Sequence, residues 1–154
     1  MLVKEYRIVL PCSLEEYQRG MLYAVAKQSS LESTGGEGME FLDNKPYTDP
    51  DTGKSGIFTK KIVRLGEKLP KWTSMVLPSE ALVLEEECWN EYPHVRTVYT
   101  CSYFEQRFQM SVETMHLEDS GTTENALGLD QKDLSARQVQ KINVTTPTEV
   151  PDGL

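Results

Sequence analysis

The sequence predicts a single α+β domain, with several short strands and one long helix near the N-terminus. Runs in which apolar and polar residues alternate recur along the chain, as in strands that bury one face. One longer segment instead repeats its apolar residues at helical spacing. The length of 154 residues, of which 38% are hydrophobic and 26% charged, fits one globular domain with its own core.

The first two predicted elements are a strand and a helix. Residues 5–10 alternate, and Pro11 ends that strand. Ser13 and Glu16 then form a capping box, in which the hydroxyl and the carboxylate each accept a hydrogen bond from a backbone amide at the helix start. Apolar residues at helical spacing extend this helix to about Ser30.

The middle of the chain predicts further strands separated by turns. A long surface loop rich in Pro, Asp, Thr and Gly is expected at 44–56. The acidic run Glu85-Glu86-Glu87 indicates a solvated edge of its strand. The predicted strands are residues 39–42, 57–65, 80–88, 95–101 and 108–114.

The last part of the chain is more polar. Residues 130–139 predict a short surface helix with Asp130 near its cap, and residues 141–144 predict a final strand. The segment 145–154, which contains two prolines, is expected to be a disordered tail.

One predicted strand places a charge in an apolar row. Because side chains alternate across a strand, Thr59 and Lys61 lie on the same face as Ile57, Val63 and Leu65. An unpaired ammonium group on a buried face is costly. Two interpretations follow: Lys61 extends to a solvated rim, or it meets an anion held inside.

Two more strands place a hydroxyl on an apolar face, at Thr97 and Thr114. Threonine is a common strand residue, so none of these positions is informative alone. Together with Thr59 and Lys61 they would form a polar cluster in an apolar concavity, which is how a pocket holds the polar end of an apolar ligand. Asn90 either caps a bend or offers its amide to the same ligand.

Several classes of function are disfavoured. A net charge of -8 disfavours binding to nucleic acid or to anionic headgroups through a basic surface. The N-terminus lacks the apolar core of a signal peptide and no stretch is long enough to span a bilayer, which predicts a cytoplasmic protein. His94 and His116 lack metal-ligand spacing, and Cys88 near His94 does not establish a nucleophile and base. We therefore expect no metal, no catalytic residue and no enzymatic activity.

The apolar segment Leu69–Pro78 is too short to span a bilayer. It is interpreted either as part of the core or as a loop that touches a membrane, with Trp72 and Met75 as the contacting residues.

Short segments with a common order and spacing between residues 1 and 144 carry a family resemblance. They are Lys4-Glu5-Tyr6-Arg7-Ile8-Val9-Leu10-Pro11, Glu16-Tyr17-Gln18, Leu22-Tyr23, Gly36-Glu37-Gly38, Pro46-Tyr47, Thr59-Lys60-Lys61, Trp89-Asn90-Glu91-Tyr92-Pro93 and Glu113-Thr114. Together they resemble the N-terminal half of a phosphatidylinositol transfer protein. Tyr99-Thr100-Cys101 is similar to the retinal-degeneration-B-like members of that family.

The resemblance implies a START-like fold, in which a strongly curved antiparallel sheet and long helices enclose one phospholipid. It implies that Thr59, Lys61 and Asn90 contact an inositol ring, and that Thr97 and Thr114 contact its phosphate. The implied function is transfer of phosphatidylinositol between membranes in exchange for phosphatidylcholine or phosphatidic acid. The phospholipid is then a ligand, no cofactor is needed, and the protein associates transiently with membrane surfaces.

Two departures from the family pattern bear on this expectation. Met21 stands where the family usually has a phosphate-contacting glutamine, which makes a lipid contact there doubtful. The family chain also continues well past residue 144, so residues 1–144 are expected to be a domain truncated at its C-terminal side. The alternative function is that of a shortened, non-transferring fragment of the same fold, which binds proteins or is recruited to membranes.

Overall fold

The structure is a computed structural model that describes residues 2–33, 39–65 and 76–145, which fall into two compact units. Residues 19–116 make up the larger unit, and the smaller unit combines the two ends of the chain, up to Gln18 and from Leu117 onward. No helix in the described ranges is long and apolar enough to cross a membrane.

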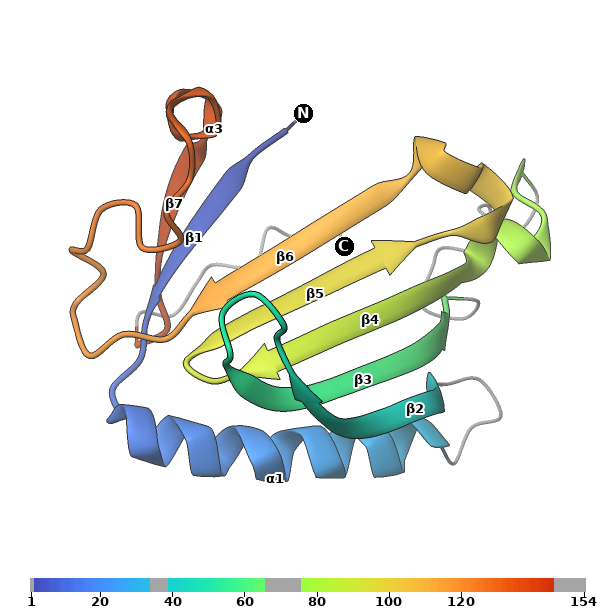
Figure 1. Ribbon diagram of the computed structural model, residues 1–154, viewed down its shortest axis with the longest axis horizontal. Helices are drawn as coiled ribbons and strands as arrows, with labels where there is room; N and C mark the ends of the chain where they lie inside the picture. The colour runs from blue at the N-terminus through green and yellow to red at the C-terminus, as the bar shows by residue number, and fades with distance from the viewer. Residues whose placement is uncertain (1, 34–38, 66–75, 146–154) are drawn as a thin grey trace. The chain divides into compact units, whose positions relative to one another are not determined.

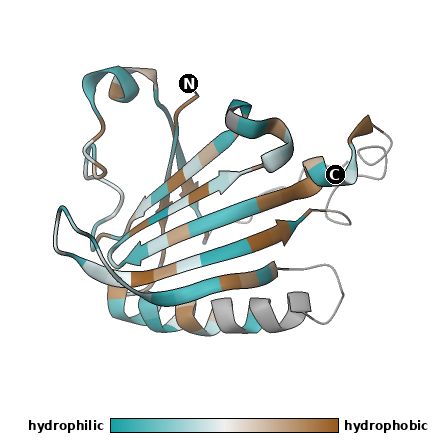
Figure 2. Ribbon diagram, turned by 45° about the vertical axis from the view of Figure 1, so that its right-hand side comes forward, coloured by the Kyte–Doolittle hydropathy of each residue, from teal (hydrophilic) through white to brown (hydrophobic). Residues whose placement is uncertain are grey.

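The larger unit holds a curved, five-stranded antiparallel sheet with its strands in sequence order (Figure 1). Hydrophilic and hydrophobic residues follow one another along these strands (Figure 2), as expected where the two faces of a sheet have different surroundings. The α+β class predicted from the sequence is confirmed. The strands are β2 (Met39–Thr48), β3 (Ser55–Arg64), β4 (Val83–Glu91), β5 (His94–Thr100) and β6 (Gln109–Met115).

Strand β2 is longer than the sequence predicted, so the expectation of a loop from residue 44 was wrong. Pro46 lies within β2 and pairs with Ile57 of β3. Because β2 is an edge strand, a residue without a backbone N–H can be accommodated there. The turn itself is held by Asp49, whose carboxylate accepts hydrogen bonds from the amides of Asp51 (2.9 Å) and Thr52 (2.6 Å).

Two 3-10 helices flank one end of the sheet, and the first of them contributes Ala81 and Leu82 to the small core of this unit. They are η2 (Ser79–Leu82) and η3 (Ser102–Arg107). The predicted strand at 80–88 therefore begins only at Val83. Cys101 is 1% exposed, and its thiol lies 3.8 Å from the backbone oxygen of Glu80. The core of the described residues comprises Ala81, Leu82, Val98 and Cys101.

Helix α1 (Leu14–Ser33) begins at the predicted capping box. The amide of Ser13 donates to Glu16 Oε2 (2.9 Å), and the amide of Glu16 donates to Ser13 Oγ (3.3 Å). The bonds that the amide and the hydroxyl of Ser13 donate to the Glu16 carboxylate lower the pKa of Glu16, because they stabilise its ionised form. The predicted helix start is confirmed. The packing of α1 against the sheet stays a prediction.

The smaller unit contains β1 (Lys4–Val9) and β7 (Gln138–Asn143), which form a parallel pair. Helix α3 (Gln131–Ala136) precedes β7, and the carboxylate of Asp130 caps it by accepting from the amide of Asp133 (2.8 Å). The predicted cap is confirmed, but the helix is shorter than 130–139. Residues from 138 onward pair with β1 instead, which the local pattern did not show.

Candidate functional site

The five residues predicted to contact a headgroup come from four neighbouring strands of the larger unit. Thr59 and Lys61 lie on β3, Asn90 on β4, Thr97 on β5 and Thr114 on β6. Residues that pair directly across strands point to the same face, as do residues two apart along one strand. The register can therefore decide whether the five share a face.

The register puts all five on one face of the sheet, called here the threonine face. Thr59 pairs with Cys88, and Cys88 pairs with Thr97, which forms one row across three strands. In the next row, Asn90 and Thr114 pair with the same residue of β5. Lys61 is two residues from Thr59 on β3 and so belongs to the same face. The predicted grouping of the threonines with the lysine is thus present in the fold.

Lys61 meets an anion that the chain itself supplies. Its Nζ lies 2.9 Å from Oε1 of Glu86, the residue that it pairs with on β4. The two side chains are 14% and 11% exposed. The lysine Nζ also lies 5.3 Å from the centroid of the Phe41 ring. Of the two interpretations of Lys61, an anion held inside is the one observed, and the anion is a glutamate.

The expectation that Glu85-Glu86-Glu87 forms a solvated edge was wrong for Glu86. Strand β4 lies in the middle of the sheet, so it is not an edge strand, and its residues alternate between the two faces of the sheet. Glu85 and Glu87 point to the opposite face, where both bind Lys60 at 3.1 and 3.0 Å. These two bonds raise the pKa of Lys60, and the bond to Glu87 contributes more than the bond to Glu85. Glu86 shares its face with Leu84 and Cys88. This alternation of apolar and acidic residues in the sequence could have indicated that Glu86 is buried while its two neighbours are not.

A tyrosine completes the polar group around Lys61. Tyr99 of β5 pairs with Glu86 across the strands. Burial raises the pKa of Tyr99 to about 12, and the negative charge of the neighbouring Glu86 adds to the increase. The phenol therefore stays protonated at neutral pH beside the Glu86 carboxylate. Lys61, Glu86 and Tyr99 form a continuous row on three neighbouring strands.

Apolar side chains surround these polar groups and remain open. Ile57, Phe41, Met110 and Val112 share the threonine face and are 45%, 46%, 46% and 45% exposed. An apolar surface that is this exposed, with a few polar groups within it, is typical of a face that is covered by a ligand or a partner.

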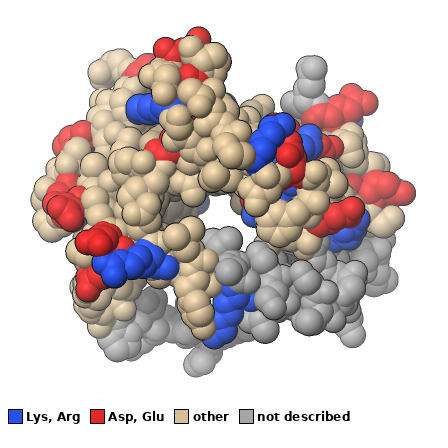
Figure 3. Space-filling model, turned by 60° about the horizontal axis from the view of Figure 1, so that its bottom comes forward, with Lys and Arg blue, Asp and Glu red and all other residues tan. Residues whose placement is uncertain are grey.

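The opposite face of the sheet is charged and aromatic, as expected of a solvated surface. Trp89 lies 5.4 Å from Phe58 between ring centroids, and Arg96 lies over the Trp89 ring at 5.5 Å. A hollow of about 270 Å³ at this face is lined by Trp89, Tyr47, Glu91 and others. On the side of the molecule drawn in Figure 3, Lys and Arg side chains lie beside Asp and Glu side chains, so charges of both signs are mixed on that surface.

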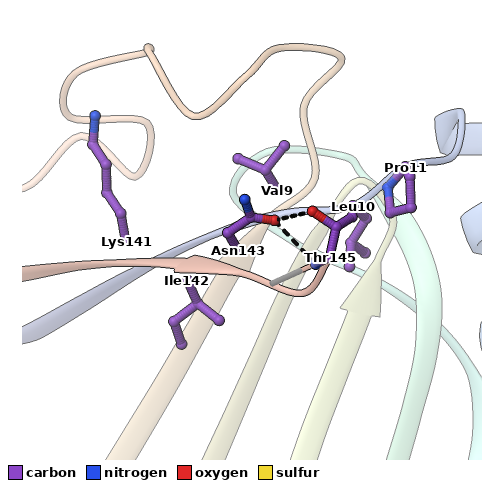
Figure 4. A pocket seen from close by; sticks show the side chains of 7 residues that line it. All are labelled: Val9, Leu10, Pro11, Lys141, Ile142, Asn143 and Thr145. Carbon is purple, nitrogen blue, oxygen red and sulfur yellow. Dashed lines mark hydrogen bonds between the residues drawn. The ribbon is translucent and has the colours of Figure 1, made fainter. Parts of the chain in front are cut away.

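A second hollow, of about 430 Å³, lies within the smaller unit (Figure 4). It is lined by residues at and just after the end of β1 and by residues of β7, among them Leu10 and Ile142. Asn143 Oδ1 accepts from the amide (3.0 Å) and hydroxyl (2.6 Å) of Thr145 at its edge. Neither hollow is lined by the five predicted headgroup residues, and the enclosed lipid cavity stays a prediction.

The remaining predicted contacts have different outcomes. Met21 lies in α1 and is 41% exposed, and its role stays a prediction. Trp72 and Met75, the predicted membrane contacts, lie outside the described residues. Among the residues that are described, no group of three or more His, Cys, Asp or Glu could hold a metal ion.

Comparison with known proteins assigns the chain to a family. The model of the family described as "Phosphatidylinositol transfer protein" matches residues 1–152. Phosphatidylinositol transfer protein 1 of Dictyostelium discoideum is 44% identical over 151 residues, which cover 98% of this chain and 56% of that protein. The human phosphatidylinositol transfer protein beta isoform is 42% identical over 150 residues, covering 97% and 55%.

A longer relative matches as well. Protein retinal degeneration B of Drosophila melanogaster is 46% identical over 145 residues, which cover 94% of this chain and 11% of that protein. The chain spans about half the length of the two shorter relatives. The resemblance noted in the sequence is confirmed, and this chain belongs to the phosphatidylinositol transfer protein family.

Proposed function

We propose that the threonine face binds the headgroup of one phosphatidylinositol molecule, and that the chain carries this lipid between membranes. The observation that supports the proposal most strongly is the strand register, which gives Thr59, Lys61, Asn90, Thr97 and Thr114 a common face. The names of the relatives support the same ligand. The chain acts in this proposal as a carrier, with no catalytic step and no cofactor.

The physical reason for a polar site is that acyl chains do not discriminate between lipids. A chain that leaves a bilayer for an apolar protein surface moves between two apolar surroundings and gains little. Selection must then come from hydrogen bonds to the headgroup. In the proposal Thr59, Lys61 and Asn90 contact the inositol ring, and the hydroxyls of Thr97 and Thr114 donate to the phosphate.

The proposal also names the lipid that is exchanged for phosphatidylinositol and the place in the cell where the protein works. Phosphatidylcholine or phosphatidic acid is the lipid carried on the return, because each shares the acyl chains and the phosphate. The chain works in the cytoplasm and touches membranes transiently, with Trp72 and Met75 as inserted groups. The predicted domain boundary at residue 144 stays a prediction, and the predicted tail lies, apart from Thr145, outside the described residues.

The exposure of the apolar side chains on the threonine face favours a second candidate. Phe41, Ile57, Met110 and Val112 are each nearly half-exposed. If no lipid covers them, the chain is a shortened fragment that associates with a protein, with itself or with a membrane surface. Gel filtration separates the two cases, because a lipid-loaded carrier elutes as a monomer and an uncovered sheet self-associates.

The direct test is native mass spectrometry of the purified chain together with a vesicle assay of phosphatidylinositol transfer. We expect one bound phospholipid. Thr97→Val should lower transfer about tenfold, because it removes a hydrogen bond to a charged group. Thr100→Val is the matched control, since Thr100 lies on the same strand but on the opposite face, where it pairs with Glu85. A protein without bound lipid, whose transfer activity is absent, would refute the proposal.

A further inference from the structure

The buried pair on the threonine face is neutral overall. Lys61 and Glu86 are in contact at 2.9 Å, and both come from interior strands of the sheet. A single lysine among threonines would be a good site for phosphate, since all its groups can donate hydrogen bonds. The carboxylate of Glu86 changes the chemistry of this position, because it adds acceptors and cancels the positive charge.

A neutral ammonium-carboxylate pair is complementary to hydroxyl groups. An ammonium has three donors and a carboxylate about four acceptor positions, so one contact between them leaves both with capacity for a ligand. A hydroxyl can accept from the lysine and donate to the glutamate at the same time. An ionised phosphate oxygen can only accept, and it is repelled by the carboxylate.

The surroundings of Glu86 hold it in place for this role. Lys61 contacts it from β3, and Tyr99 pairs with it from β5. Cys88 is the next residue on the same face of β4, and it belongs to the row of Thr59 and Thr97. The neutral pair is therefore adjacent to the row that carries the threonine hydroxyls. In a phosphatidylinositol headgroup the ring hydroxyls and the phosphate are adjacent in the same way.

We propose that Glu86 is a specificity-determining residue, which turns Lys61 from a phosphate-binding group into one that recognises a polyhydroxylated headgroup. This inference rests on the proposed function of the threonine face. It names the part of that face that distinguishes phosphatidylinositol, which carries ring hydroxyls, from phosphatidic acid, which exposes only phosphate.

The test is competitive loading from vesicles that contain equal amounts of phosphatidylinositol and phosphatidic acid, with mass spectrometry of the bound lipid. Wild-type protein should load mainly phosphatidylinositol. Glu86→Gln keeps the side-chain shape and leaves Lys61 as an uncompensated cation, so it should shift the ratio of bound lipids about tenfold toward phosphatidic acid. Glu85→Gln is the matched control, because Glu85 lies on the opposite face, and it should keep the wild-type ratio.

A double variant keeps the test decisive if Glu86→Gln does not fold. Lys61→Gln with Glu86→Gln removes both charges, and it should lose the preference for phosphatidylinositol without gaining one for phosphatidic acid. An unchanged ratio in either folded variant would overturn the role of Glu86 while the proposed function stands. Wild-type protein that loads no phospholipid would overturn the proposed function and this inference with it.

Discussion

Lys61 on β3 and Glu86 on β4 form a hydrogen-bonded ion pair of 2.9 Å in the interior of the sheet, with side chains that are 14% and 11% exposed. Each charge is therefore compensated by the other. Removing one partner leaves an uncompensated buried charge, whereas removing both does not. The pair is a source of specificity in our proposal, and its contribution to stability can be tested separately.

Lys61→Ala should lower the free energy of unfolding by about 3–5 kcal/mol, because it leaves Glu86 buried without its cation. The double variant Lys61→Met with Glu86→Leu should be close to wild type in stability. Urea unfolding measures both. Lys45→Ala is the control, since Lys45 is 60% exposed in its pair with Asp43 and should change stability by less than about 1 kcal/mol. Equal effects of Lys61→Ala and Lys45→Ala would contradict the buried pair.

A methyl group at Gly56 should disturb the site through Asn90. A Cβ at Gly56 would lie 2.2 Å from the backbone oxygen of Asn90, so β3 and β4 must separate there. We expect Gly56→Ala to cost about 1–3 kcal/mol of stability and to weaken phosphatidylinositol binding.

Gly20→Ala is the matched control for Gly56→Ala. Gly20 is in the interior of α1, and among the described residues nothing outside the helix backbone lies within 4 Å of a Cβ there. It should raise the free energy of unfolding by about 0.5–1 kcal/mol. If the unfolding curves of Gly56→Ala and Gly20→Ala shift in the same direction, the close contact of Gly56 with Asn90 is contradicted.

The smaller unit should lose stability in acid because of Glu124. Hydrogen bonds from Arg7 and Arg137 lower the pKa of Glu124 from 4.5 to about 2. The carboxylate thus binds its proton less readily in the folded protein, so its contribution to stability is complete above about pH 4.5 and is lost as the pH falls toward 2. Asp49, whose pKa is also lowered to about 2, titrates in the same range in the larger unit.

Glu124→Gln isolates the contribution of Glu124. The variant should be less stable than wild type at pH 6, and the difference should shrink toward pH 2, where about half of the wild-type carboxylates are protonated. Urea unfolding at several pH values measures this difference. A difference that is the same at pH 6 and pH 2 would show that the charge of Glu124 does not matter.

Cys88 offers a chemical probe of the threonine face. Its thiol belongs to the row between Thr59 and Thr97, so a bound headgroup should cover it. Phosphatidylinositol should slow the reaction of Cys88 with a maleimide several-fold, as followed by mass spectrometry of peptides. Cys12 is exposed and serves as the internal control, whose rate should not change. Equal protection of both thiols, or of neither, would contradict a headgroup on this face.

Local features of the chain could be predicted because they depend on residues a few positions apart. The alternation of β3 established that Thr59 and Lys61 share a face, and the capping box at Ser13 located the start of α1. The position of Asp130 at the cap of α3 was also predictable. In each case the interacting groups are neighbours in the sequence.

The tertiary structure decided what each strand lies beside. Pro46 is tolerated in a strand because β2 is at an edge, and residues 138–139 leave the predicted helix because β7 pairs with β1. The sequence alone determined that Lys61 needs an anion or a route to water. Only the register of β3 against β4, which brings Lys61 beside a residue 25 positions away, decided that Glu86 supplies that anion.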